Sequence, residues 1–202
     1  PEASVESCLE LCTRARAAGD SADSSGMQAA LAELQENLEQ LRRDELAAAD
    51  LEVEVTAREP EPVGTIVARS SRLGGARVAP GQVPALIDEV PALAVAAAFA
   101  QGEFELSGAE ELRFKESDRL ATLAEGLRAM GVLVDERRDG LRIRGGARPA
   151  GARVSSHGDH RIAMAFSVAA LAAAGETTIE GAEAAAVSFP EFYERLRSAA
   201  RA

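Results

Sequence analysis

The sequence predicts an α/β fold in which one structural unit is repeated, preceded by a separate helical segment. From residue 49 onward, short strand-like runs alternate with longer helical patterns, which is typical of α/β domains. Gly102 and Gly108 recur with the same spacing as Gly175 and Gly181. This spacing indicates a duplicated helix–strand–helix unit, whose copies must pack together to bury their apolar faces.

Length and composition exclude several classes of protein. The 202 residues carry a formal net charge of −11, which argues against nonspecific binding to nucleic acid or to an anionic membrane. Two cysteines and two histidines are too few for a disulfide framework or a Cys/His zinc site. No apolar run is long enough to span a bilayer, and no signal peptide is visible. We therefore expect a cytoplasmic protein, and its start at Pro1 suggests a processed or excised piece.

Residues 1–48 are predicted to form two helices of unassigned origin. Cys8 and Cys12 lie on an apolar stripe of helical spacing, so we expect core cysteines there and not a metal site or a disulfide. A second stripe, formed by leucines, follows a Gly-, Asp- and Ser-rich break at residues 19–26. The acidic faces of these helices fit solvated surface better than a docking site for a partner.

The first elements of the repeated region follow from local patterns. An alternating run predicts a strand at residues 51–56, and a second strand at 63–69 follows a Pro-rich turn. An Ala-rich stretch predicts a helix at 84–100, and a strand is predicted at 103–107. A stripe of leucines predicts a helix at 118–130.

The last elements are a strand pair, a helix, a strand and a final helix. The first four are predicted at residues 132–135, 141–144, 162–174 and 177–180. Asp139-Gly140 is the hairpin signal between the paired strands. The helix is apolar nearly all round, which predicts burial on every side. Ser188-Phe-Pro-Glu191 is interpreted as a capping box that opens the final helix.

Cations gather at the predicted starts of helices. The 22 Lys and Arg residues include a single lysine, Lys115. Because Lys and Arg are not interchangeable, its retention suggests contact with an anionic ligand, although a chance survivor on a solvated turn fits as well. Arg119 and Arg161 open two helices, where a cation is disfavoured unless an anion joins it. Helix N-termini suit phosphate and carboxylate groups, so the sequence predicts a cationic pocket for an anion.

Carboxylates and a histidine accompany these cations. Asp88 and Glu116 are candidates for proton transfer beside a cationic site. His160 is a candidate for proton transfer or hydrogen-bond donation. Ordinary helix capping is the simpler interpretation of Asp88 and of Asp159 when each is taken alone, and both interpretations stay open.

Four motifs, in order, resemble the 5-enolpyruvylshikimate-3-phosphate (EPSP) synthase family. They are Asp88-Glu-Val-Pro-Ala-Leu-Ala-Val95, Arg113-Phe-Lys-Glu-Ser-Asp-Arg119, Gly158-Asp-His-Arg-Ile-Ala-Met164 and Ser188-Phe-Pro190. Each motif is weak alone, whereas the ordered set is specific. The resemblance covers about residues 49–202. It implies the C-terminal lobe of the enolpyruvyl transferase fold, with repeated βαβαββ units around buried parallel helices.

The resemblance also implies a reaction of the shikimate pathway for aromatic amino acid biosynthesis. The enolpyruvyl group of phosphoenolpyruvate passes to the 5-hydroxyl of shikimate 3-phosphate and phosphate is released, with no metal or organic cofactor. By motif, Lys115 resembles the lysine that contacts shikimate 3-phosphate, and Arg119 and Arg161 resemble the arginines that clamp phosphoenolpyruvate. The expected catalytic residues are Asp88, Glu116 and His160, and the expected substrate-binding residues are Asp88, Lys115, Arg119 and Arg161.

The chain also departs from the family pattern. Two repeated units are recognisable, with a third represented by the strand at residues 51–56, and Val187 stands where some members carry a lysine. The other lobe of the family fold is missing, so a complementary N-terminal lobe is an expected partner.

Two classes of function therefore remain open. The chain is either an enzyme domain holding half of an active site or a noncatalytic ligand-binding or interaction module derived from that lobe. The retained site residues favour the enzyme domain. A related transferase acting on a UDP-sugar is disfavoured, because the motifs point to shikimate chemistry.

Overall fold

The computed structural model describes residues 50–56, 63–69, 71–146 and 148–200. The two helices predicted within residues 1–48 lie outside these ranges. The described chain begins with an antiparallel hairpin of β1 (Asp50–Thr56) and β2 (Val63–Arg69). This hairpin confirms both strands predicted there.

The first repeated unit has the predicted order βαβαββ. In chain order it contains β3 (Ala76–Val78), α4 (Val90–Phe99), β4 (Glu103–Leu106), α5 (Arg119–Ala129), β5 (Leu133–Arg137) and β6 (Gly140–Arg144). A short helix α3 (Val83–Leu86) precedes α4, and a 3₁₀ turn η1 (Glu110–Phe114) precedes α5. The sheet order is β3-β4-β6-β5, with β3 parallel to β4 and the other pairs antiparallel.

The second unit repeats the first at the level of the backbone. It contains β7 (Arg153–Ser155), α6 (His160–Ala172), β8 (Thr178–Glu180), the 3₁₀ turn η2 (Ala182–Val187) and α7 (Phe192–Ala199). The strands β7 and β8 are parallel, as β3 and β4 are. The equivalent glycines share left-handed φ angles, 92° and 95° at Gly102 and Gly175, and 73° and 72° at Gly108 and Gly181. The predicted duplication is therefore confirmed.

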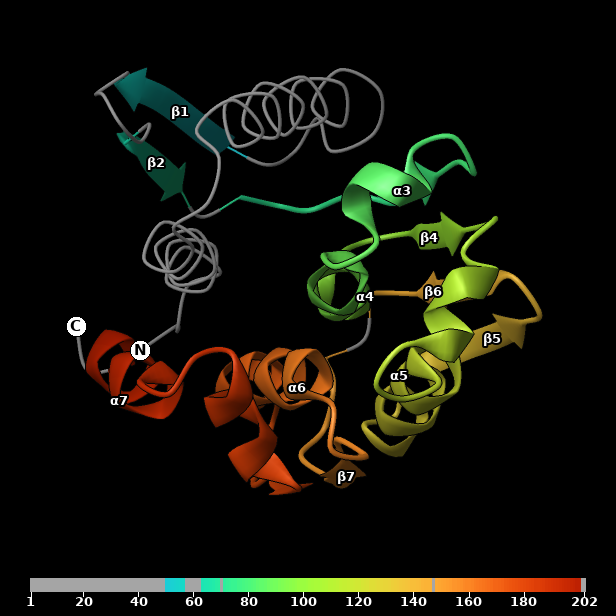
Figure 1. Cartoon of the computed structure of the whole chain (residues 1–202). Helices are drawn as coiled ribbons and strands as arrows, with labels where there is room; N and C mark the ends of the chain where they lie inside the picture. The colour runs from blue at the N-terminus through green and yellow to red at the C-terminus, as the bar shows by residue number, and fades with distance from the viewer. Residues whose placement is uncertain (1–49, 57–62, 70, 147, 201–202) are drawn as a thin grey trace.

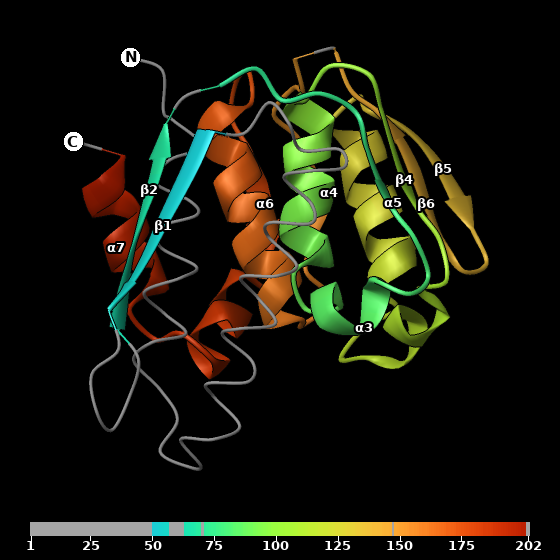
Figure 2. The same cartoon turned by 90° about the horizontal axis from the view of Figure 1, so that it is seen from above.

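The helices α4, α5 and α6 lie side by side in the centre of the molecule (Figures 1 and 2). No residue of α6 is exposed, which confirms the predicted burial on every side. At Gly126 of α5, an added Cβ would lie 2.1 Å from the ring of Phe166 on α6. The absence of a side chain at Gly126 lets the two helices approach closely.

The single helix predicted over residues 84–100 is wrong, because the chain forms two helices there. Pro91 has no N–H and its ring clashes with the carbonyl four residues earlier, so α3 ends at Leu86 and α4 starts anew with Pro91 in its first turn. The break leaves Asp88 and Glu89 at the N-terminal end of α4.

The β5–β6 hairpin forms as predicted, with its turn inside the expected connection Arg137-Arg138-Asp139-Gly140, and both strands extend one or two residues further than predicted. Gly140 pairs with Arg137 in the ladder, so Arg138 and Asp139 form the turn. The glycine is needed for a different reason, since a Cβ at Gly140 would lie 1.9 Å from the carbonyl oxygen of Leu106.

The predicted capping box before α7 does not form. The N-cap is Glu191, without a side-chain hydrogen bond. Ser188 instead ends η2 with helical φ and ψ angles of −111° and −24°, whereas an N-cap residue takes an extended backbone.

Candidate functional site

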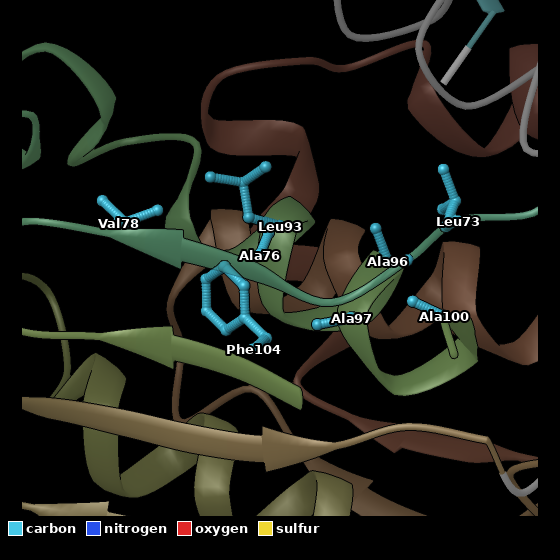
Figure 3. Close-up of a pocket in the computed structure, with 9 residues that line it drawn as sticks. Leu73, Ala76, Val78, Leu93, Ala96, Ala97, Ala100 and Phe104 are labelled. Carbon is cyan, nitrogen blue, oxygen red and sulfur yellow. The ribbon is translucent and has the colours of Figure 1, made fainter. Parts of the chain in front are cut away.

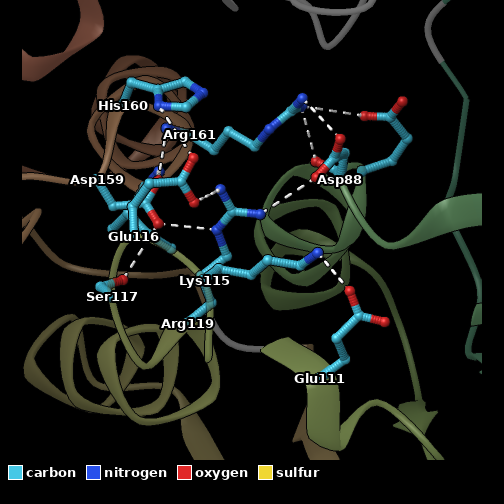
Figure 4. A network of polar contacts seen from close by, with 11 residues as sticks. Asp88, Glu111, Lys115, Glu116, Ser117, Arg119, Asp159, His160 and Arg161 are labelled. Atoms are coloured by element: carbon cyan, nitrogen blue, oxygen red, sulfur yellow. Dashed lines mark hydrogen bonds and ion pairs between the residues drawn. The ribbon is translucent and has the colours of Figure 1, made fainter. Parts of the chain in front are cut away.

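Arg119, the first residue of α5, lies at the centre of the predicted site with a side chain only 1% exposed. Its guanidinium donates to three carboxylates: Nε to Asp159 at 2.8 Å, Nη2 to Glu116 at 2.6 Å and Nη1 to Asp88 at 3.3 Å (Figure 4). A buried charge needs such partners. The contacts bring the N-terminal ends of α4, α5 and α6 together, as the sequence predicts.

Asp159 is fully buried and uses its two carboxylate oxygens for different tasks. Oδ1 caps α6 by accepting from the backbone N–H groups of Arg161 and Ile162, at 2.9 and 3.4 Å. Oδ2 accepts from Arg119 and from the hydroxyl of Ser117 at 3.2 Å. The capping interpretation of Asp159 is therefore confirmed, and the same carboxylate also anchors Arg119.

The environment of Asp159 favours its ionised form. Burial by itself would raise the pKa of the carboxyl group, but the hydrogen bond and charge of Arg119 outweigh it, with help from the two backbone N–H groups. The pKa of Asp159 consequently lies below its ordinary value, as expected for a carboxylate with several donors.

Asp88, in the break between α3 and α4, bridges two arginines. One carboxylate oxygen contacts Arg119, and the other accepts from Arg161 Nη2 at 2.9 Å. Arg161 also donates to the backbone carbonyl of Asp88 at 3.1 Å and lies 3.8 Å from the carboxylate of Glu89. Since Glu89 is the N-cap of α4 and no side chain caps that helix, the capping interpretation of Asp88 is wrong.

Glu116 and His160 lie next to each other at the edge of the cluster. Glu116 Oε1 is 3.8 Å from His160 Nδ1, while Oε2 accepts from Arg119. The side chain of Glu116 is 48% exposed and that of His160 14%. A ligand can therefore reach the carboxylate of Glu116 from solvent, and the neighbouring imidazole is a second group able to transfer a proton.

Lys115 follows η1, and its ammonium pairs with Glu111. The Nζ–Oε1 distance is 2.5 Å across an i,i+4 spacing, and the side chain of Glu111 is 68% exposed. Exposed pairs of this kind contribute about 0.3–0.5 kcal/mol, so an incoming anion can displace Glu111 at small cost. The spacing of Glu111 and Lys115 is visible in the sequence and is the signal that points to this pair.

The cluster differs from the cationic pocket that the sequence predicts, because its cations are paired within the chain. Lys115, Arg119 and Arg161 contact Asp88, Glu89, Glu111, Glu116 and Asp159. The helix starts supply acids as well as bases, and folding pairs them because an unpaired buried charge is costly. The structure thus brings the six predicted site residues together and adds three carboxylates to them.

The arrangement suits binding of anions and proton transfer. Arg161 and Lys115 keep 32% and 26% of their side chains exposed, so each can exchange an internal carboxylate for a ligand anion.

Within the described ranges, no group of three or more His, Cys, Asp or Glu side chains could hold a metal ion. No helix of the described residues is long and apolar enough to cross a membrane.

A concave region away from this cluster lacks titratable side chains. A pocket of about 30 Å³ lies between α4 and β3, next to Phe104 of β4 (Figure 3), and is lined as well by Leu73, Leu93, alanines, Gly74 and Val78. Its apolar lining offers no group for acid–base or anion chemistry. The polar cluster is therefore the candidate functional site.

Comparisons with known proteins identify the family of the chain. A family model described as EPSP synthase (3-phosphoshikimate 1-carboxyvinyltransferase) matches residues 24–196. The match starts inside the segment predicted as separate, and the boundary at residue 48 stays a prediction.

Individual relatives carry the same description. The 3-phosphoshikimate 1-carboxyvinyltransferase of Roseiflexus sp. (strain RS-1) is 50% identical over 153 residues, which is 74% of this chain and 35% of the relative. That of Salinibacter ruber (strain DSM 13855 / M31) is 55% identical over 137 residues, covering 67% of this chain and 32% of the relative.

A solved structure of an EPSP synthase from Acinetobacter baumannii superposes with a TM-score of 0.73 at 42% identity. The superposition covers 83% of this chain and 38% of that one. The chain thus spans about a third of the length of the curated relatives it matches. The described sheets and helices have the enolpyruvyl transferase fold. The chain belongs to the EPSP synthase (3-phosphoshikimate 1-carboxyvinyltransferase) family.

Proposed function

We propose that this chain supplies one half of an active site that transfers the enolpyruvyl group of phosphoenolpyruvate to shikimate 3-phosphate in the shikimate pathway. The observation that carries the proposal is the convergence of Asp88, Glu116, Arg119 and Arg161 at the N-terminal ends of three helices. These are the residues that the family motifs supply, and the family match covers all of them. No cofactor is required by the proposed chemistry.

The two anionic substrates would be held by the cations of the cluster. Arg161 and Arg119 clamp phosphoenolpyruvate, and Lys115 contacts the phosphate of shikimate 3-phosphate. Binding requires each ligand anion to replace an internal carboxylate, such as Asp88 on Arg161 or Glu111 on Lys115. The exchange preserves the pairing of the cations and fixes both substrates, which otherwise repel each other, in a reactive orientation.

Proton transfer would fall to the carboxylates that the substrates uncover. A base accepts the proton of the 5-hydroxyl while its oxygen bonds to C2 of phosphoenolpyruvate, and an acid protonates the methylene carbon. Loss of a proton from the resulting methyl group and cleavage of the bond between C2 and the phosphate oxygen then release phosphate and form the enol ether. Asp88 and Glu116 are the groups we assign to these steps, and His160 beside Glu116 assists.

The missing part of the site would come from a complementary N-terminal lobe. The chain spans about a third of the length of its relatives, and its cluster is open to solvent on the side of Glu116 and Asp88. The reaction needs an enclosed site, since water weakens every electrostatic interaction in it. We place the reaction in the cytoplasm, because two cysteines are far fewer than a disulfide-stabilised secreted protein uses.

The test is phosphate release from the two substrates by the chain mixed with the complementary lobe of a relative. The proposal predicts turnover that Glu116→Gln lowers by about 100-fold or more, the size of a general acid–base contribution. Glu110→Gln is the matched control, because the side chain of Glu110 is 47% exposed, close to the 48% of Glu116, and pairs with Arg138 on the surface. Tight binding of shikimate 3-phosphate without any turnover would favour a noncatalytic module. Equal turnover by both variants would rule out the proposed role of Glu116.

A further inference from the structure

Arg113 is the one cation of the motif Arg113–Arg119 that the proposed function leaves unused. Besides its bonds to carboxylates, its guanidinium donates to two backbone carbonyls, which charge pairing alone does not require. Nε donates to the backbone carbonyl of Arg138 at 2.7 Å, and Nη2 to that of Arg137 at 2.5 Å. Both carbonyls belong to the tip of the β5–β6 hairpin.

The remaining nitrogen of Arg113 binds two carboxylates, one at the start of α5 and one on β5. Nη1 contacts Asp118 at 2.8 Å and Glu136 at 3.1 Å. Asp118 is the N-cap of α5 and accepts from the N–H of Ala121 at 3.0 Å. Arg113 therefore joins η1, the cap of α5 and the hairpin through one planar group.

The segment between Arg113 and Asp118 carries Lys115 and Glu116 and leads directly into α5. It is held at one end by Arg113 and at the other by the capped helix, and its two ends meet in the contact between Arg113 and Asp118. Phe114, within it, has a side chain 79% exposed, so apolar burial of that residue does not fix the segment. Polar contacts hold the segment instead: the hydrogen bonds of Arg113 at its start, and those of Glu116 with Arg119 and of Ser117 with Asp159 within it.

The side chain of Arg113 is only 20% exposed, and its pairing is strong. Burial opposes the charge, but Asp118 and Glu136 outweigh burial and raise the pKa of the guanidinium above its ordinary value. A lysine could not replace it, because an ammonium lacks the planar fork that reaches two carbonyls and two carboxylates together.

We propose that Arg113 is a positioning residue, which sets the place of Lys115 and Glu116 by fastening their segment to the β5–β6 hairpin. The expected effect on turnover rests on the proposed function, whereas the effect of Arg113 on the position of the segment does not depend on it. Displacement of a reacting group by about 1 Å lowers rates by about 100-fold, so loosening this segment should affect turnover far more than stability.

The experiment uses the single lysine of the chain as a reporter. Selective isotope labelling of lysine marks Lys115 alone, and NMR relaxation then gives the order parameter of its backbone amide. Arg113→Gln should lower that order parameter from about 0.85, typical of rigid backbone, to below about 0.6. Arg137→Gln is the matched control: it removes another hairpin guanidinium, which pairs with Glu105 and Asp135 and does not touch the segment.

The same variants are then compared in the enzyme assembled with the complementary lobe. Arg113→Gln should lower kcat by about 10- to 100-fold, while its thermal midpoint stays close to that of Arg137→Gln, whose kcat changes less than about two-fold. If Arg113→Gln does not fold, Arg113→Met, which keeps most of the aliphatic stem and leaves Lys115 the only lysine of the chain, gives the same two readings. An unchanged order parameter at Lys115 would overturn the proposal. If the assembled wild type shows no turnover, the proposed function fails, and the order parameter still decides the role of Arg113.

Discussion

The buried carboxylate of Asp159 both caps α6 and binds the guanidinium of Arg119. Its lowered pKa means that the ionised form stabilises the fold above the ordinary value of 3.8, and that this stabilisation is lost as pH falls below 3.8. We expect Asp159→Asn to lose about 3 kcal/mol of unfolding free energy at neutral pH, because a buried pair is broken. Urea unfolding at several pH values measures the unfolding free energy, which should fall less steeply below pH 3.8 in the variant than in the wild type. An equal fall in both proteins would contradict the lowered pKa of Asp159.

Arg161 should matter for ligand binding more than for folding. Its side chain is 32% exposed, and its main partner Asp88 would keep a contact to Arg119 in its absence. Arg161→Ala should therefore cost less than about 1 kcal/mol of stability and weaken binding of phosphoenolpyruvate by about 10-fold or more, as loss of a charged hydrogen bond does. Calorimetric titration and thermal unfolding measure the two effects. Losses of similar size in affinity and in stability would show that Arg161 acts in folding and not in ligand binding.

Lys115 tests whether a point charge or a planar cation is needed. Lys115→Arg keeps the charge and the pair with Glu111 within reach, but the fork differs from an ammonium in geometry. We expect weaker binding of shikimate 3-phosphate by about 10-fold, measured by titration of the assembled enzyme. An unchanged dissociation constant would mean that the lysine is a solvated surface residue.

At the scale of elements, the packing of α5 on α6 depends on a glycine. A Cβ at Gly126 would lie 2.1 Å from the ring of Phe166, so Gly126→Ala should destabilise the chain by about 1–3 kcal/mol through overpacking. Gly81→Ala is the control, since nothing lies within 4 Å of a Cβ there. Denaturant unfolding measures both variants, and equal stability would show that the helices can separate without cost.

The elements were largely predictable because their signals are local. Alternation, leucine stripes and the recurring glycines identify both units, and the φ angles of Gly108 and Gly181 confirm the duplication. The errors arise where two local signals compete. Pro91 divides a stretch whose apolar content predicts one helix, and Ser188 carries a capping pattern but is already used by η2.

The sequence predicts which residues belong to the site better than it predicts which acid pairs with which base. The sequence identifies Arg119 and Arg161 because cations at helix starts are unusual, yet Arg119 and Asp159 are 40 residues apart. Which acid pairs with which base follows from the packing of three helices, and local patterns do not encode it. In place of the predicted cationic pocket, the structure has a network in which five carboxylates pair with three cations.

At the scale of the whole molecule, the repeated unit explains why the site lies where it does. Asp88 and Arg161 occupy equivalent positions 73 residues apart, before α4 and at the start of α6, and they contact each other. Stacking two copies with parallel helices places their polar ends together and leaves their apolar faces to form one core. A cluster built from repeats in this way opens on one side, where the family resemblance predicts a second lobe.

The measurement that tests the central proposal most directly follows the carbon atoms. The chain and the complementary lobe are incubated with shikimate 3-phosphate and phosphoenolpyruvate labelled with ¹³C, and the products are analysed by mass spectrometry. Transfer predicts that the labelled three-carbon unit appears as an enol ether of shikimate 3-phosphate, and that Glu116→Gln suppresses it. Label found only in phosphoenolpyruvate or pyruvate, from chains shown to associate, would contradict the proposal that this chain completes an enolpyruvyl transfer site.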